Sequence, residues 1–134
     1  MGPNQEETMP PPYDAARLTR LGHEWIAAWN ARDLDRVLTL YAEDFEMSSP
    51  HIHAMGFDPS GTLRGKPRIR EYWATALARL PDLHFDLIDL FVSPDSVVVF
   101  YENERGKRIC EYLRLDAHGK IAQASGNYGV SSSS

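Results

Sequence analysis

The residue best placed to take part in a reaction is Glu111, in the stretch from Arg108 to Leu115 that reads as a β-strand. Side chains alternate between the two faces of a strand, so every second residue shares the face of Glu111. Three apolar residues do so: Ile109, Leu113 and Leu115. A carboxyl on such a face loses hydration, which raises its pKa unless a partner stabilises the charge. Glu111 is therefore a candidate general acid or base. The alternative is a structural pairing with a buried partner such as Asn127.

Two histidines, His51 and His53, lie in an irregular segment that contains several prolines and glycines, residues 49–65. A histidine beside a carboxyl of raised pKa forms a proton-transfer pair, and His51 is the candidate for that role. The alternative is that both histidines face water. Their spacing could also suit a metal, but no cysteine and no third ligand at a diagnostic spacing accompanies them. We predict no metal site.

Aromatic residues are frequent, and most of them are expected to form the core. Apolar pockets that also carry a few polar groups bind small ligands. We expect some of these side chains to line such a pocket, together with two asparagines. The predicted ligand-binding residues are Trp25, Trp29, Tyr41, Trp73, Tyr101, Asn103 and Asn127. No nucleophile elbow or glycine-rich phosphate loop is present, and no cofactor is predicted.

Hydrophobic periodicity places helices in the first half of the chain. Residues 13–30 carry apolar side chains at helical spacing, and Asp14 can cap their start. Asp33 is a second candidate cap, for a short helix whose apolar face ends at Tyr41. A brief strand is expected at residues 45–48. Pro67 suits the first turn of a third helix that ends at Pro81.

The second half of the chain reads as four strands joined by short turns: residues 84–92, 97–103, 108–115 and 120–128. Helices followed by an antiparallel meander indicate an α+β domain. The helices should cover one face of the sheet. In the last strand, either the set that contains Ser125 and Asn127 faces inward, or the set that contains Ala124 and Tyr128 does, and the sequence leaves both open.

Size and charge limit the possible classes of function. The 134 residues suit one domain, expected at residues 13–130, between disordered tails at 1–12 and 131–134. The net charge of −5, without a basic run, argues against nucleic acid. No stretch has the length and apolarity to span a membrane. The single cysteine, Cys110, fits a reducing cytoplasm, which is the expected location.

Several short motifs, in order and at their spacing, resemble the nuclear transport factor 2-like superfamily in its SnoaL-like polyketide cyclase and ketosteroid isomerase branch. They are Trp29-Asn30-Ala31-Arg32-Asp33-Leu34-Asp35, Leu40-Tyr41-Ala42-Glu43-Asp44-Phe45, Leu63-Arg64-Gly65-Lys66-Pro67 with Ile69-Arg70-Glu71-Tyr72-Trp73, and Tyr112-Leu113-Arg114-Leu115-Asp116 with Gly119-Lys120-Ile121. The resemblance implies a cone-shaped fold, in which three N-terminal helices pack on a strongly curved, mostly antiparallel sheet and enclose a pocket. It also implies a homodimer formed through the sheet.

Carried over position by position, the resemblance argues against steroid isomerisation by the mechanism of those isomerases. Their oxyanion-donating tyrosine corresponds to Trp25 here, and their carboxylate base corresponds to Ser49, before Pro50. Their protonated aspartic acid, a second oxyanion donor, corresponds to Glu111. One of the three positions, Glu111, therefore still carries a carboxyl group, and the strand pattern identifies the same residue.

Two functions remain. The first is a cofactor-independent isomerase-, cyclase- or dehydratase-type enzyme that moves a proton on an apolar cyclic or polyketide-like substrate, with Glu111 as acid or base and His51 as its partner. The second is a noncatalytic ligand-binding or dimeric interaction module. The fold does not decide between these functions, because the superfamily holds both enzymes and binders. The partner expected in either case is a small apolar molecule.

Overall fold

The computed structural model describes residues 14–130 and has an α+β architecture, as the sequence predicts. The tails expected at 1–12 and 131–134 lie outside the described residues. Helices and strands follow one another along the chain with the bounds α2 Ala15–Asn30, α3 Leu34–Leu38, β1 Tyr41–Ser48, α4 Pro50–Ala54, β2 Thr62–Arg64, α5 Lys66–Arg79, β3 Asp86–Ser93, β4 Ser96–Glu102, β5 Arg108–Leu115 and β6 Ile121–Tyr128.

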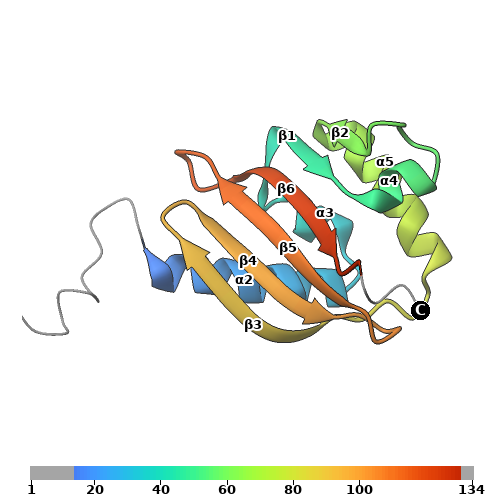
Figure 1. Ribbon diagram of the computed structural model, residues 1–134. Coiled ribbons are helices and arrows are strands. Elements are labelled where there is room, and N and C mark those ends of the chain that lie inside the picture. Colours follow the sequence, from blue (N-terminus) through green and yellow to red (C-terminus); the bar gives the residue numbers. More distant parts are fainter. Residues whose placement is uncertain (1–13, 131–134) are drawn as a thin grey trace, which may run out of the picture.

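The strands form one six-stranded sheet in the order β2-β1-β6-β5-β4-β3. The four strands of the second half make an antiparallel meander, β2 pairs antiparallel with β1, and β1 pairs parallel with β6. Helices α2 and α3 lie behind the sheet, with α4 and α5 at the side of β1 and β2 (Figure 1). Strands β1 and β2 thus extend the meander at its β6 edge, and the core lies between the sheet and the helices.

The caps expected at the first two helices are confirmed. Asp14 accepts a hydrogen bond from the amide of Arg17 at 3.0 Å, and Asp33 accepts one from Arg36 at 3.1 Å. The first helix begins at Ala15, since Asp14 is its cap, and Tyr13 lies outside the described residues. The short second helix ends at Leu38, so Tyr41 belongs to β1 and not to the apolar face of that helix.

The segment 49–65 is more ordered than the sequence suggests. Ser49 caps a fourth helix, α4, with its hydroxyl accepting from the amide of His51 at 3.2 Å, and Pro50 fits the first turn of that helix. The short strand β2 then pairs with the end of β1. Residues 14–130 therefore contain four helices and not three. A helix of five residues is too short to produce a clear periodicity in the sequence.

Asn30, at the end of α2, links the helix to Phe85, the residue before β3. Its amide donates to the carbonyl of Phe85 at 2.9 Å, and its carbonyl accepts from the amide of Phe85 at 2.8 Å. Arg32, which follows α2 with a φ of 58°, donates to the carbonyls of Leu77 and Leu80, both at 2.8 Å. These bonds satisfy the end of α5 and fix it beside the end of α2.

The last strand changes face part-way along. The register shifts between Arg114 and Leu115, which pair with Gln123 and Ile121 respectively, so Ala122 is an extra residue. Ile121 is buried, and beyond the irregularity Ala124 and Gly126 are buried. The inward set near the end of β6 is thus the one that contains Ala124 and Tyr128, and Asn127 is exposed on the opposite face.

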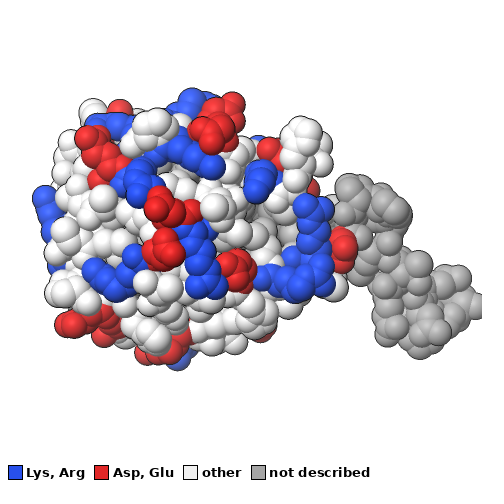
Figure 2. Space-filling view, turned by 180° about the vertical axis from the view of Figure 1, so that it is seen from behind, with Lys and Arg blue, Asp and Glu red and all other residues white. Residues whose placement is uncertain are grey.

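Charged side chains of both signs are interspersed over the side of the molecule opposite to that of Figure 1 (Figure 2). Ion pairs connect neighbouring helices, with Arg36 to Glu24 at 2.8 Å and Arg70 to Asp35 at 2.7 Å. Within residues 14–130, no helix is long and apolar enough to cross a membrane.

Candidate active site

A cavity of about 370 Å³ lies between the inner face of the sheet and the helices. It is bounded by α2, α4 and α5, by the chain that follows α5, by the β4–β5 hairpin, and by inner residues of β1, β4, β5 and β6. Its lining is formed by Trp25, Trp29, Met47, Ser49, His51, Met55, Tyr72, Trp73, Ala76, Arg79, Leu80, Leu83, Tyr101, Asn103, Glu104, Arg105, Lys107, Glu111, Gly126 and Tyr128.

Glu111 lies in the wall of this cavity, on the inner face of β5. Its neighbours across the sheet are Val99 and Gly126, and the residue is only 5% exposed. Its carboxyl forms no hydrogen bond or ion pair with the described residues. Burial therefore raises the pKa of Glu111 to about 8. A carboxyl with that pKa is largely protonated at neutral pH and can both accept and donate a proton near pH 8.

Three tyrosines of the lining lie close enough to Glu111 for its charge to affect them: Tyr72, Tyr101 and Tyr128. Burial, and to a smaller extent the charge of Glu111, raises the pKa of each hydroxyl. These hydroxyls therefore stay protonated and can donate hydrogen bonds within the cavity.

Ser49 holds a central place in the cavity although it cannot act as the base of the related isomerases. It is only 6% exposed and caps α4. A hydrogen bond with Ser49 lowers the pKa of both Tyr72 and Tyr128, against the larger effect of burial. The serine thus joins two of the tyrosines beside Glu111. The resemblance drew attention to position 49 only because the carboxylate base of the isomerases is absent there.

The apolar wall is a network of aromatic rings. Trp25 stacks on Phe85, with ring centroids 5.7 Å apart, and packs against Tyr101 at 5.5 Å. Trp29 contacts Trp73 edge-on at 5.0 Å. The indole nitrogen of Trp29 is fully buried and has no hydrogen-bond partner within residues 14–130. Such edge-to-face packing favours a fixed cavity shape.

Tyr41 supports this wall from behind and does not line the cavity. It is 1% exposed and accepts a hydrogen bond from the indole nitrogen of Trp25 at 2.9 Å. Tyr41 also packs against Phe45 and Trp73, with centroids 4.3 Å and 5.2 Å away. The tyrosine therefore fixes the orientation of Trp25 and Trp73.

His51 lies on the wall formed by α4. Its ring meets Tyr128 edge-on at 4.9 Å. His51 and His53 are both exposed, as the alternative of water-facing histidines expects. Partial burial of the ring still lowers the pKa of His51, and the positive charges of Lys107 and Arg105 lower it further. Among the described contacts no hydrogen bond joins His51 to Glu111, although both residues line the same cavity. An imidazole with this lowered pKa is neutral at pH 7 and can accept or donate a hydrogen bond.

The two asparagines have different surroundings. Asn103 lines the cavity, and its side-chain oxygen accepts from the amides of Arg105 and Lys107, which shapes the β4–β5 hairpin. Asn127 donates to the carbonyl of Cys110 at 3.0 Å and to Ser125. Asn127 points away from the inner face and does not pair with Glu111, so that alternative is wrong.

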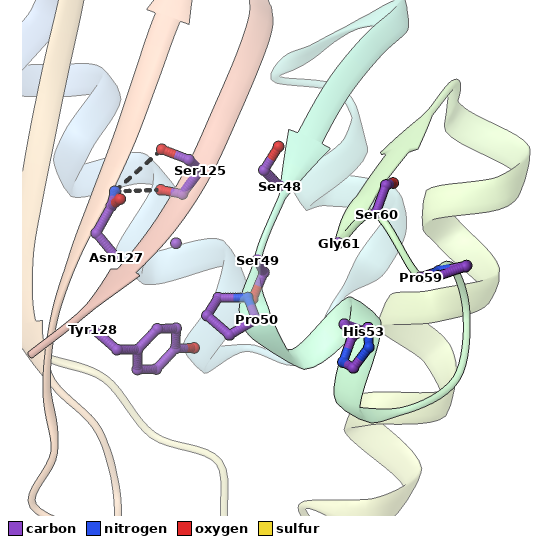
Figure 3. A pocket seen from close by; sticks show the side chains of 11 residues that line it. Ser48, Ser49, Pro50, His53, Pro59, Ser60, Gly61, Ser125, Asn127 and Tyr128 are labelled. Atoms are coloured by element: carbon purple, nitrogen blue, oxygen red, sulfur yellow. Dashed lines mark hydrogen bonds between the residues drawn. The ribbon is translucent and has the colours of Figure 1, made fainter. Parts of the chain in front are cut away.

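Asn127 and His53 instead line a second, open hollow of about 560 Å³, between β6 and the chain from the end of β1 to Gly61 (Figure 3). Its other residues are mainly small and polar, and include Ser48, Ser60 and Ser125. Within residues 14–130, no three His, Cys, Asp or Glu side chains come together as a metal site would require.

Several cavity residues were missed from the sequence. Met47, Met55, Leu80 and Leu83 give no signal beyond hydrophobicity. Gly126 is noticeable only once its strand partner, Glu111, is known. The basic hairpin sequence Glu104-Arg105-Gly106-Lys107 reads as a turn, and its position over a cavity depends on tertiary packing.

Comparison with known proteins places the chain among SnoaL-like proteins. The model of the SnoaL-like domain matches residues 23–124. A SnoaL-like protein of unknown function from Burkholderia thailandensis has 40% sequence identity and a TM-score of 0.84, over 88% of this chain and 98% of that one. A search of curated proteins gave no match.

More distant structures share the fold. A candidate isomerase of the SnoaL-like family from Agrobacterium tumefaciens has 16% identity and a TM-score of 0.68, over 85% of this chain and 98% of that one. A candidate polyketide cyclase from Sinorhizobium meliloti has 14% identity and a TM-score of 0.67, over 86% of this chain and all of that one (100%). The match of the family model and the relative with 40% identity together show that the chain belongs to the SnoaL-like family, on a nuclear transport factor 2-like fold.

Proposed function

We propose that this protein binds a small, mainly apolar cyclic molecule in the cavity and moves a proton on it, as an isomerase-, cyclase- or dehydratase-type enzyme. The observation that carries the proposal is the unpartnered carboxyl of Glu111, which is 5% exposed and lines a cavity walled by aromatic rings. Stable folding alone would favour an apolar residue at such a position, because an unpaired buried carboxyl is costly. Clefts of this volume and lining are typical of small-molecule sites.

In the proposed reaction, the carboxylate of Glu111 takes a proton from a carbon next to a substrate carbonyl. The electron pair moves onto the carbonyl oxygen, and the hydroxyls beside Glu111 donate hydrogen bonds to the resulting enolate. The protonated Glu111 then returns the proton to the same or another carbon. No cofactor is needed for this step. A pKa of about 8 suits both halves of the transfer, because a general base works best near the operating pH.

The reaction can be tested with 2-tetralone, a bicyclic ketone with acidic hydrogens next to its carbonyl. We expect the protein to accelerate exchange of these hydrogens for deuterium in D2O by about 10²–10⁴-fold over buffer. Glu111→Gln should return exchange to the buffer rate. Ser125→Ala, on the outer face of β6, is the matched control and should keep the wild-type rate. Exchange that is equal in Glu111→Gln and in the wild type would contradict a catalytic Glu111.

The second candidate is a noncatalytic binding protein. It is favoured by the lack of a second acid or base in hydrogen-bond contact with Glu111 among residues 14–130. This candidate predicts that 2-tetralone binds, that the wild type does not accelerate exchange, and that Glu111→Gln leaves its affinity unchanged.

We also propose that two copies pair through the outer face of the sheet. The support is a row of neighbouring apolar side chains on three strands, Phe91, Val98 and Tyr112, with Phe91 54% exposed. Exposed apolar surface of this kind is typical of interfaces. Light scattering should give a dimer at micromolar concentration, and Phe91→Glu should give a monomer. A monomeric wild type would contradict the pairing.

A further inference from the structure

The open end of the cavity is more basic than the rest of the molecule. Arg79 is the last residue of α5, and Arg105 and Lys107 flank Gly106 in the β4–β5 hairpin. All three line the cavity, whereas the chain as a whole has a net charge of −5. The C-terminal end of α5 and the hairpin lie at the same end of the molecule (Figure 1). Two segments far apart in the sequence thus bring cations to one opening.

These cations have few anionic partners. Within residues 14–130, Arg79 and Lys107 form no ion pair, and Arg105 reaches Glu104 only at 4.0 Å. One oxygen of Glu104 also accepts a hydrogen bond from the amide of His84. On the helices, by contrast, Arg36 and Arg70 approach their carboxylate partners to 2.8 Å and 2.7 Å. The opening of the cavity therefore carries uncompensated positive charge.

The charge acts across the cavity. Lys107 and Arg105 come from the hairpin, and they lower the pKa of His51 on the opposite wall, in addition to the larger effect of burial. An anion between these walls would face the hairpin cations on one side and the ring of His51 on the other.

We infer that the ligand of the cavity is an apolar ring system that carries a carboxylate, which lies at the opening against Arg79, Arg105 and Lys107. This inference rests on the proposed function and names the class of its substrate. The opposite orientation would bury the carboxylate against the aromatic wall and the largely neutral carboxyl of Glu111, where it would be desolvated with no cation to pair with. The cations therefore orient the ring system with its reacting carbon toward Glu111.

The test compares carboxylic acids with their primary amides, which have nearly the same shape without the charge. Suitable pairs are benzoate with benzamide, 2-naphthoate with 2-naphthamide, and 4-phenylbenzoate with 4-phenylbenzamide. Binding is measured by calorimetry at pH 7 and low ionic strength. We expect at least one acid to bind about tenfold more tightly than its amide, since exposed ion pairs each contribute modestly.

The variant for this test is Arg79→Gln with Lys107→Gln, since both residues are exposed and unpaired among the described residues. In this double variant, the affinity for the acid should fall close to the affinity for its amide, and the affinity for the amide should not change. The control is Arg20→Gln, an exposed arginine of α2 away from the cavity, which should keep the full preference.

Each result decides the matter. If amides bind as tightly as acids, the inference is wrong and the proposed cavity function stands. If the preference for the acid survives in the double variant, the cations do not cause it and the inference is again wrong. If no acid or amide binds at millimolar concentration, the inference and the proposed binding site both fail.

Discussion

Glu111 and Gly126 face each other across the β5–β6 pair, and the absence of a side chain at Gly126 leaves the space beside the carboxyl open. A Cβ atom at position 126 would lie 3.4 Å from Oε1 of Glu111, 3.5 Å from the ring of Tyr128 and 3.7 Å from the hydroxyl of Ser49. The three side chains therefore surround one small volume of the cavity. In the proposed function, the reacting carbon of the substrate would occupy it.

A methyl group at this position should exclude the substrate without disturbing the fold. The contacts that Gly126→Ala would make are ordinary van der Waals contacts. We expect the melting temperature to change by only a few degrees. We expect exchange of 2-tetralone to fall about tenfold or more, because small misplacements of a reacting atom have large effects on rate. Ala124→Gly, which is buried one inward position earlier on β6, creates space instead and is the comparison for stability. Undiminished exchange in Gly126→Ala would contradict this location of the reacting atom.

Glu111→Gln should stabilise the protein in a pH-dependent way. The pKa of Glu111 is raised from 4.5 to about 8 on folding, so the folded state keeps a proton that the unfolded state releases. The wild type is therefore most stable, as far as Glu111 is concerned, below pH 4.5, and it loses this stability as the pH rises to about 8. Glutamine does not ionise, so the free energy of unfolding of the variant, relative to that of the wild type, should increase by roughly 3 kcal/mol between pH 4 and pH 7.

Urea unfolding at pH 4, 7 and 9 measures this difference. Asp44→Asn is the control, since Asp44 is exposed and the same unit of charge is removed. A difference between Glu111→Gln and the wild type that stays constant from pH 4 to pH 9 would mean that the carboxyl is not desolvated.

Tyr41→Phe should destabilise the fold. It removes the acceptor of the buried hydrogen bond from Trp25, at 2.9 Å, and leaves the indole N–H without a partner. The expected loss in the free energy of unfolding is about 1–3 kcal/mol. Tyr112→Phe removes a hydroxyl from the outer face of β5 and should have little effect. Equal effects of the two substitutions would argue that the Trp25–Tyr41 bond does not contribute to stability.

Asn30→Ala should weaken the connection between α2 and β3. Both of its bonds to the backbone of Phe85 would be lost, and Phe85 stacks on Trp25 in the wall of the cavity. We expect a loss of about 1–3 kcal/mol in the free energy of unfolding and faster amide exchange at Phe85. Asn127→Ala, whose bonds are exposed, should lose less. Unchanged protection of the Phe85 amide would contradict the role of Asn30.

The sequence predicts those features that depend on local patterns. The alternation in β5 places Glu111 on the buried face, and the carboxylates of Asp14 and Asp33 identify two helix starts. The irregularity at Ala122 cannot be derived this way, because an extra residue in one strand is defined only by its pairing with the neighbouring strand. The sequence therefore does not determine which face of the sheet carries Asn127.

In the candidate site, too, local patterns predict some residues and tertiary packing determines the others. Trp25, Trp29, Trp73, Tyr101 and Glu111 line the cavity, as the burial pattern and the resemblance suggest. Tyr41 does not line the cavity as expected. Strand β1 begins earlier than expected, at Tyr41, and the tyrosine hydroxyl accepts a hydrogen bond from Trp25 behind the wall. The cations at the opening come from a helix end and a hairpin 26 to 28 residues further along the chain, and only the tertiary fold brings them together.

The proposed function depends on a desolvated carboxyl of Glu111 in the cavity, and direct titration of that carboxyl tests it. Protein labelled with ¹³C at the glutamate side-chain carboxyls is titrated by NMR from pH 4 to pH 10, and Glu111→Gln identifies the resonance. We predict a midpoint of about 8 for Glu111. A midpoint near 4.5, the ordinary value, would contradict the account.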